Sequence, residues 1–107
     1  MNLKFLIHSL IIKSFRFIEV NLFNTISGQE VAKAPHITVP TLYRHFQKEL
    51  NMTPLDYQRL RKLDEALELL QTKEYLVKDV AFLVGHEDQA AFSKAFKKRF
   101  GHSPSNI

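Results

Sequence analysis

The chain has 107 residues, a net charge of +4 and no cysteine, and 45% of its residues are hydrophobic. This composition is sufficient for one folded domain with a modest core, and it excludes disulfide frameworks and thiolate metal sites, zinc fingers included. Glycine and proline are few, and helix-forming residues dominate after residue 29, so we expect an all-α fold.

Residues 1–24 are expected to form an N-terminal helix. Phe15, Ile18 and Leu22, preceded by Ile11, recur at steps of three or four, which is typical of a helix face packed on a domain. His8 and Ser9 interrupt the first apolar run, and no small-residue cleavage site follows it, which argues against a secretory signal.

A membrane-surface helix is an alternative for the same segment. It would use an apolar set with flanking lysines, namely Phe5, Leu6, Ile7, Ile11 and Ile12 with Lys4 and Lys13. The run is shorter than the ~20 residues that a bilayer-spanning helix needs. A packed helix is favoured because the polar face is thin, and no membrane partner is expected.

Residues 25–53 are expected to form a first helix-turn-helix. Ser27 and Glu30 have the spacing of a capping box, which predicts a short helix from about residue 28 to 34. Pro35 ends that helix because proline lacks an amide donor and forces the preceding residue out of the helical region.

A longer helix then follows from about residue 38 to 50. Thr38 is a suitable N-cap, and Leu42, Phe46 and Leu50 line one face. Asn51 ends the helix at a position that favours a left-handed residue.

Residues 54–72 are expected to form a long linker helix. Pro54 opens it at a first-turn position, and its length is roughly 25 Å at 1.5 Å per residue. Its predicted apolar face consists of residues at steps of three and four: Tyr57, Leu60, Leu63, Leu67 and Leu70.

Residues 73–107 are expected to form a second helix-turn-helix with a truncated last helix. A short helix near residues 77–84 should end at Gly85, and Asp88 should cap a longer one. Phe92, Phe96 and Phe100 form an aromatic stripe on that helix, which we interpret as core. Gly101 stops it, and Ser103-Pro104 begins one more.

The two helix-turn-helix segments repeat each other. A shift of fifty residues pairs Thr38 with Asp88, Leu42 with Phe92, Arg44 with Lys94, Phe46 with Phe96, Leu50 with Phe100, Thr53 with Ser103 and Pro54 with Pro104. Upstream the shift is forty-nine, and it pairs Val31 with Val80 and Ala32 with Ala81. The second copy therefore has one extra residue between its short and long helices.

The second helix of such a unit can enter the DNA major groove while the first lies across the backbone. If Leu42 and Phe92 point inward, other side chains on each long helix point outward: Thr41, Tyr43 and Arg44 on the first, and Gln89, Ser93 and Lys94 on the second. Arg44 could bond a guanine edge and Gln89 an adenine edge. Two copies could read two successive groove segments about 10.5 bp apart.

Phosphate contacts are expected from a second group of side chains. Lys48, Lys97 and Lys98 would add affinity and salt dependence rather than sequence choice. Five basic residues crowd the last copy with no acid among them, whereas Asp64, Glu65 and Glu68 lie on the linker helix; the five are Lys94, Lys97, Lys98, Arg99 and His102.

The segment from Val80 to Pro104 resembles the signature of the AraC/XylS family of bacterial transcription regulators. Its frame of Ala81, Gly85, Phe92, Phe96-Lys97, Phe100-Gly101 and Pro104 carries the resemblance. The first copy matches through Ala32, Thr38, Leu42, Arg44, Phe46, Lys48 and Thr53-Pro54, followed by Tyr57, Arg61 and Ala66 on the linker. The resemblance covers about residues 15–107.

This resemblance implies a seven-helix domain of two helix-turn-helix subdomains joined by a linker helix. It implies base-facing positions at Pro40, Tyr43 and Arg44 in the first copy and at Gln89, Ala90, Ser93 and Lys94 in the second. Thr38 and Thr41 join the three lysines as phosphate contacts. The implied protein is a cytoplasmic, nucleoid-associated regulator, an activator by class, with double-stranded DNA as its partner and RNA polymerase as a second candidate.

Three departures from the family pattern stand out. His36 replaces a usual glycine in the first turn, and His86 replaces a usual phenylalanine, so its polar ring must find a partner. The family's closing Tyr-Arg does not follow Ile107. The chain is either a regulator that acts alone, like the small MarA/SoxS-type members, or part of a longer one.

The sequence argues against an enzyme. Its five histidines are scattered, and no metal-spaced pair, nucleophile elbow or phosphate loop is present, so we expect no cofactor, no metal and no small-molecule ligand. A helical protein-binding module, or a degenerate fragment that no longer binds DNA specifically, remains the main alternative.

Overall fold

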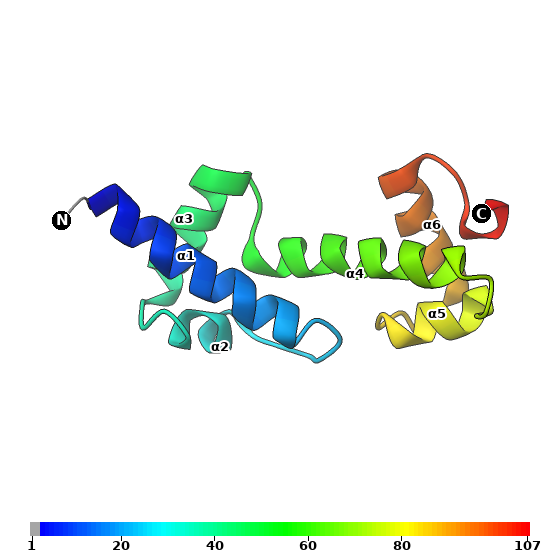
Figure 1. Ribbon diagram of the computed structural model, residues 1–107, viewed down its shortest axis with the longest axis horizontal. Coiled ribbons are helices and arrows are strands. Elements are labelled where there is room, and N and C mark those ends of the chain that lie inside the picture. Colours follow the sequence, from blue (N-terminus) through cyan, green and yellow to red (C-terminus); the bar gives the residue numbers. More distant parts are fainter. Residues whose placement is uncertain (1–2) are drawn as a thin grey trace. The chain divides into compact units, whose positions relative to one another are not determined.

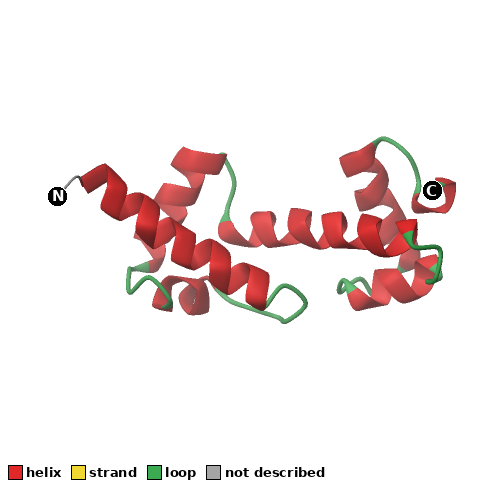
Figure 2. Ribbon diagram, in the orientation of Figure 1, coloured by secondary structure: helices red, strands yellow, loops and turns green. Residues whose placement is uncertain are grey.

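The structure is a computed structural model that describes residues 3–107, with side chains from His8 onward. Within that range it is all-α, as predicted, and Figure 2 shows only helices joined by loops. Six α-helices and one short 3-10 helix follow in chain order (Figure 1): α1 (Leu3–Val20), α2 (Gly28–Lys33), α3 (Val39–Leu50), α4 (Pro54–Gln71), α5 (Val77–Leu83), α6 (Gln89–Phe100) and η1 (Pro104–Asn106). The side chains of Phe5, Leu6 and Ile7, named for a membrane-surface helix, lie outside the described residues.

The expectation of seven α-helices is corrected to six. The predicted last helix is the 3-10 turn η1, in which the Asn106 amide donates to the Ser103 carbonyl at 3.1 Å. Three residues cannot close the i to i+4 hydrogen bond of an α-helix, so the tighter geometry forms instead. Among the described helices, none is long and apolar enough to cross a membrane.

The chain divides into two compact units, Met1–Gln58 and Arg59–Ile107. The boundary lies inside α4, so this helix contributes its first residues to one unit and the remainder to the other. The first unit also contains α1, α2 and α3, and the second contains α5, α6 and η1.

The core of the first unit is built from α1, α2 and α3 and the segments between them. Its buried hydrophobic members are Ile11, Ile18, Leu22, Ile26, Val31, Ala32, Leu42 and Phe46. Phe15 and Tyr57 complete an aromatic cluster with Phe46, whose ring centroids lie 5.0 to 6.2 Å apart. The predicted apolar residues are therefore confirmed as packed, but the helix expected to residue 24 ends at Val20, and Leu22 packs from the turn that follows.

The core of the second unit is built in the same way from α4, α5 and α6. Its buried hydrophobic members are Leu63, Ala66, Leu70, Val80, Ala81, Val84, Phe92 and Phe96. Phe100 is partly buried, and its ring centroid lies 4.6 Å from that of Phe96, so the predicted aromatic stripe is confirmed.

The repeat also includes the helix before each helix-turn-helix, which was not predicted. A shift of fifty-two residues pairs the buried positions of α1 with those of α4: Ile11 with Leu63, Ser14 with Ala66, and Ile18 with Leu70. Each unit is therefore a three-helix assembly, and α4 has the role in the second unit that α1 has in the first.

The predicted apolar face of α4 is only partly correct. Leu63 and Leu70 are buried, but Leu60 is half-exposed and belongs to neither core. Gln58 is buried instead, and its Nε2 donates to the carbonyls of Leu22 and Asn24, both at 3.0 Å. Because α4 serves two cores, no single periodic stripe runs along it.

The predicted boundaries of α3 and α6 are confirmed by their caps. Thr38 accepts a hydrogen bond from the Thr41 amide, and Asp88 accepts one from the Ala90 amide at 2.8 Å. At the other ends, Asn51 and Gly101 adopt left-handed conformations with φ of 56° and 86°. These caps satisfy amides and carbonyls that lack partners inside a helix.

Candidate nucleic-acid interface

The two long helices α3 and α6 present the same surface. Each residue from Leu42 to Leu50 on α3 is buried, half-buried or exposed to the same degree as its counterpart fifty positions later, from Phe92 to Phe100 on α6. Leu42, Phe46, Phe92 and Phe96 are fully buried. The exposed faces are consequently in register, and a ligand that fits one can fit the other in the same way.

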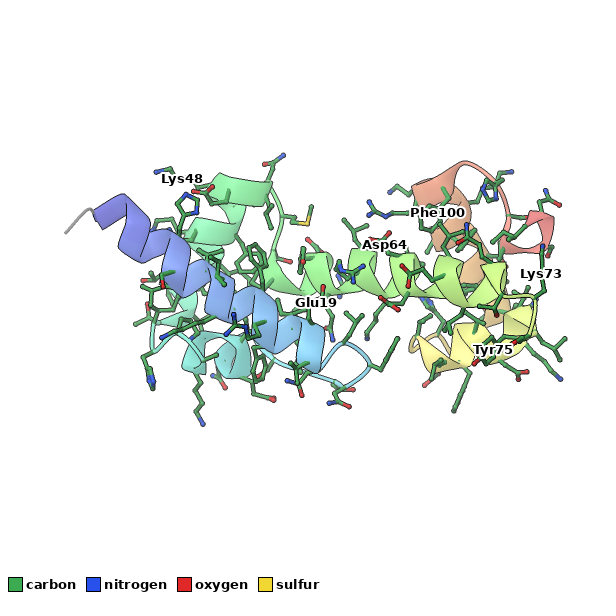
Figure 3. All side chains as sticks on the ribbon, viewed as in Figure 1. Glu19, Lys48, Asp64, Lys73, Tyr75 and Phe100 are labelled. Carbon is green, nitrogen blue, oxygen red and sulfur yellow. The ribbon has the colours of Figure 1, made fainter. Side chains whose placement is uncertain are left out.

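A cation lies at the same exposed position in each copy. Arg44 and Lys94 are both exposed, and so are Lys48 and Lys98. Figure 3 labels Lys48 on α3. Lys97 is also exposed, on the α6 face that carries Lys94. Each helix therefore presents positive charge to solvent along more than one turn.

The first turns of the two helices carry the remaining predicted base-facing positions. Pro40 at the start of α3 is exposed, and so are Gln89 and Ala90 at the start of α6. Ser93 is half-buried one turn further on. N-terminal residues of a recognition helix are the ones that reach base edges in helix-turn-helix proteins.

Tyr43 differs from the other predicted base-facing residues. It is half-buried and packs against the first core. A Cβ added at Gly28 would lie 3.0 Å from the Tyr43 Cε1 and hydroxyl oxygen, so the ring rests on the start of α2. Only part of the ring remains available to a ligand.

The two threonines predicted as phosphate contacts are already engaged locally. The Thr38 hydroxyl accepts from the Thr41 amide and donates to the Thr41 hydroxyl at 2.8 Å. Thr38 is exposed and Thr41 is half-buried. Their hydroxyls thus serve first to begin α3, and they retain lone pairs and one proton for further bonds.

The turns between the short and long helices have matching backbone hydrogen bonds. The His36 amide donates to the Lys33 carbonyl at 3.1 Å, and the Gly85 amide donates to the Phe82 carbonyl at 3.0 Å. His36 and Gly85 are both left-handed, with φ of 60° and 92°. They are forty-nine residues apart, which is the register predicted for this part of the repeat.

The extra residue of the second copy follows this left-handed position. Two residues separate His36 from Val39 at the start of α3, whereas three separate Gly85 from Gln89 at the start of α6. The predicted insertion is therefore confirmed, and it leaves the helices on either side intact.

His36 holds a conformation that favours glycine. A residue with a Cβ is strained in the left-handed region by about 1–2 kcal/mol, although histidine is found there more often than most residues. The replacement of the family's glycine is thus tolerated at a cost confined to the first unit.

His86, expected to need a partner, packs its ring edge against Phe92 with a centroid distance of 5.6 Å. The ring is half-buried. Burial lowers the pKa of the His86 imidazole, and the nearby Lys62 charge lowers it further. The His86 ring therefore favours its neutral form at this place.

Arg99 belongs to a different surface from the three lysines of α6. Its Nε and Nη2 donate to Asp64 Oδ1 at 3.1 and 3.0 Å, and Nη2 also lies 3.1 Å from Oδ2. Asp64, labelled on α4 in Figure 3, also accepts from Arg61 Nη1 at 3.2 Å. This network fixes α6 to α4, and the sequence offered no local signal for it because 35 residues separate the two partners.

The comparisons with known proteins agree with this geometry. A family described as helix-turn-helix domain matches residues 31–107. The chain is also 36% identical over 97 residues to the transcriptional activator AarP of Providencia stuartii, an alignment that covers 91% of this chain and 72% of AarP. The chain belongs to the AraC/XylS family. It carries that family's DNA-binding domain.

Solved structures show the same fold. An AraC-type regulator of Chromobacterium violaceum matches with a TM-score of 0.87 at 20% identity, over 92% of this chain and 88% of that one. The DNA-binding domain of AdpA, solved with a target DNA, matches with a TM-score of 0.73 at 21% identity, over 94% of this chain and 86% of that one. The AraC/XylS chain described here spans about a third of the length of several curated relatives that it matches.

No group of residues in the described part of this AraC/XylS domain could hold a metal ion. The predicted positions on the two long helices include cations, an amide and hydroxyls. Such groups bind phosphates and base edges.

Proposed function

We propose that this AraC/XylS domain binds double-stranded DNA sequence-specifically, with α3 and α6 as recognition helices in two adjacent major-groove segments. One observation carries the proposal, which is the repetition of an exposed cation beside polar side chains at the same positions of both helices. Arg44 and Lys94 hold these positions, and both are exposed. Packing in the core constrains only the inward faces of α3 and α6. The cations repeated on the outward faces are therefore explained in this proposal by a ligand that both helices bind.

We assign base reading to seven positions and phosphate contact to five. The base-reading positions are Pro40, Tyr43 and Arg44 on α3 and Gln89, Ala90, Ser93 and Lys94 on α6. The phosphate positions are Thr38, Thr41, Lys48, Lys97 and Lys98. Arg44 can bond a guanine edge in bidentate fashion, and Pro40 and Ala90 can offer only apolar contact, for instance to a thymine methyl group.

Residues 25–53 and 73–107 act as the two reading segments in this proposal, with residues 54–72 as the linker between them. The expected target is an asymmetric site in which two blocks lie about one helical turn, ~10.5 bp, apart. The match to the AdpA domain, which was solved with a target DNA, supports this mode of binding.

The regulator activates transcription in this proposal, because AarP and other relatives are named transcriptional activators. Activation requires an effect on RNA polymerase, which becomes the second partner. Such a protein acts in the bacterial cytoplasm, where the nucleoid lies. Transcription in vitro from a promoter that carries the bound site, with and without the chain, tests the sign of regulation.

The experiment that tests DNA reading is in-vitro selection on a randomised 30 bp duplex at physiological salt. Two enriched blocks with centres one helical turn apart would support a bipartite reader with both copies active. Enrichment of one block alone would restrict reading to one helix. No enrichment would contradict the proposal and favour a helical protein-binding module.

A further inference from the structure

A pocket of about 220 Å³ lies in the second unit, between α4 and the turn that joins α5 to α6. Three nitrogen-bearing side chains, Arg59, Lys62 and His86, share its lining with an apolar wall of Leu63, Val84 and Ala95. Sites for drug-sized ligands occupy about 300–1,000 Å³. This pocket is therefore suited to a smaller ligand, and the titratable groups of its lining are all cationic or neutral.

The Lys62 ammonium lines this pocket and has no carboxylate partner among the side chains that the structure describes. A Cβ added at Gly85 would lie 3.5 Å from Lys62 Nζ, so the ammonium rests against the turn. Among residues 8–107, whose side chains are described, Lys62 forms no ion pair with a carboxylate. A half-buried cation that lacks an opposite charge carries a desolvation cost that a bound anion would offset.

The neighbouring groups increase this cost. Burial lowers the pKa of the Lys62 ammonium, and the Arg59 guanidinium lowers it further. His86, on the other side, has a lowered pKa for the same two kinds of reason, burial and the Lys62 charge. Lys62 and His86 thus line one pocket whose lining residues include no carboxylate.

The fold does not require polar groups at these positions. The fifty-two-residue shift that pairs α1 with α4 places Leu10 at the position of Lys62. The forty-nine-residue shift of the turn places Ile37 at the position of His86. The first unit folds with these apolar side chains, and Ile37 packs against its core. Nitrogen-bearing side chains at these two positions, Lys62 and His86, occur in the second unit and not in the first.

We propose that this pocket binds a phosphate group, held by the Lys62 ammonium and the His86 ring N–H, with the exposed Arg59 at its edge. Phosphate carries up to two charges and accepts hydrogen bonds in several directions. It can therefore engage donors on α4 and on the turn at the same time, which a planar carboxylate does less well.

The turn's own amides do not take part. The Gly85 and His86 amides already donate to the Phe82 and Ala81 carbonyls, so the anion would be held by side chains. The phosphate comes either from the DNA backbone or from a free phosphate ion. The first source rests on the proposed DNA binding, and the second does not.

The first test uses the full chain with inorganic phosphate and no DNA. Phosphate at ten times its dissociation constant should raise the melting temperature of the wild type by about 5 °C beyond chloride at equal ionic strength. Phosphate also stabilises proteins non-specifically. Lys62→Gln should lose the specific increment, whereas Lys78→Gln, an exposed lysine of α5 outside the pocket, should keep it.

A measurement on the wild type keeps the test independent of variant stability. The ring signals of His86 should shift in a phosphate titration followed by NMR, and those of the exposed His8 should not. The second test measures the salt dependence of DNA binding. If a DNA phosphate fills the pocket, Lys62→Gln should reduce the salt slope by about 1, and if a free ion fills it the slope should be unchanged.

The proposal is overturned if His86 does not respond to phosphate, Lys62→Gln stabilises with phosphate as the wild type does, and the DNA salt slope is unaffected. Loss of DNA binding alone would contradict the proposed function and leave the phosphate result standing.

Discussion

The two units of this AraC/XylS domain have the same three-helix plan but place their polar groups differently. The first unit keeps a serine, Ser14, in its core and a histidine, His36, at its left-handed turn. The second unit has Ala66 and Gly85 at those positions, and its charged groups surround α4 instead. The exposed faces of α3 and α6 nevertheless match in exposure over residues 42–50 and 92–100, and both carry cations at two equivalent positions.

The two copies differ in some positions and agree in others. One core position differs in polarity between the copies, Ser14 against Ala66, whereas the exposed cations Arg44 and Lys48 recur as Lys94 and Lys98. The first unit should therefore have the lower free energy of unfolding of the two units. Both units should contribute to the affinity for DNA.

The largest expected effect on stability is at Gln58. Gln58→Ala would leave the carbonyls of Leu22 and Asn24 without their donor, and it should destabilise the first unit by about 2 kcal/mol. Amide hydrogen exchange, which resolves the two units, should show the loss in residues 8–57. Gln29→Ala, an exposed glutamine of α2, is the matched control and should change stability by less than about 0.5 kcal/mol.

Ser14 offers a test in the opposite direction. Its hydroxyl is fully buried and has no hydrogen-bond partner in the described part of the chain. Ser14→Ala should stabilise the first unit by about 1–2 kcal/mol in urea unfolding, since it removes an unsatisfied polar atom. The reciprocal change, Ala66→Ser, should destabilise the second unit. Equal effects of both substitutions, in the same direction, would show that the two core positions are not equivalent.

The left-handed turn residues of the two units should respond to substitution in opposite directions. His36→Gly should stabilise the first unit by about 0.5–1 kcal/mol, because glycine adopts a φ of 60° without strain but loses more entropy on folding. Gly85→Ala should destabilise the second unit by about 1 kcal/mol for the same reason. Thermal unfolding of both variants measures this, and a destabilising His36→Gly would mean that the histidine side chain stabilises the turn.

The smallest effect is expected at Arg99. Its ion pair with Asp64 is about one-third exposed, so Arg99→Gln should cost no more than about 1 kcal/mol of stability. Because the guanidinium is occupied, the salt slope of DNA binding should stay the same, whereas Lys98→Gln should lower it by about 1. A drop in the slope for Arg99→Gln would place this residue on the DNA.

Local features of this chain could be predicted from sequence because neighbouring residues determine them. Thr38, Asp88 and Asn51 act within four residues of their partners, and the repeat paired Val31 with Val80, which are both buried. These interactions depend on spacing, which a sequence displays directly.

Long-range features could not be predicted in the same way. Gln58 bonds to carbonyls 34 to 37 residues away, and Arg99 pairs with a residue 35 positions earlier. The equivalence of α1 and α4 was also missed, because it rests on burial at matching positions rather than on similar side chains. Tyr43 was expected to point outward, and only the packing of α2 shows that its ring rests on Gly28.

The most direct test of a two-copy DNA reader is charge reversal at its two equivalent positions. Arg44→Glu and Lys94→Glu should each weaken binding to the selected site by at least roughly 10-fold, since a base contact contributes about 1–3 kcal/mol. Each should also remove footprint protection from a different block of the site. Lys13→Glu, an exposed position on α1, is the control for net charge, and circular dichroism should show unchanged folding. If neither reversal alters affinity more than Lys13→Glu does, α3 and α6 are not the recognition helices.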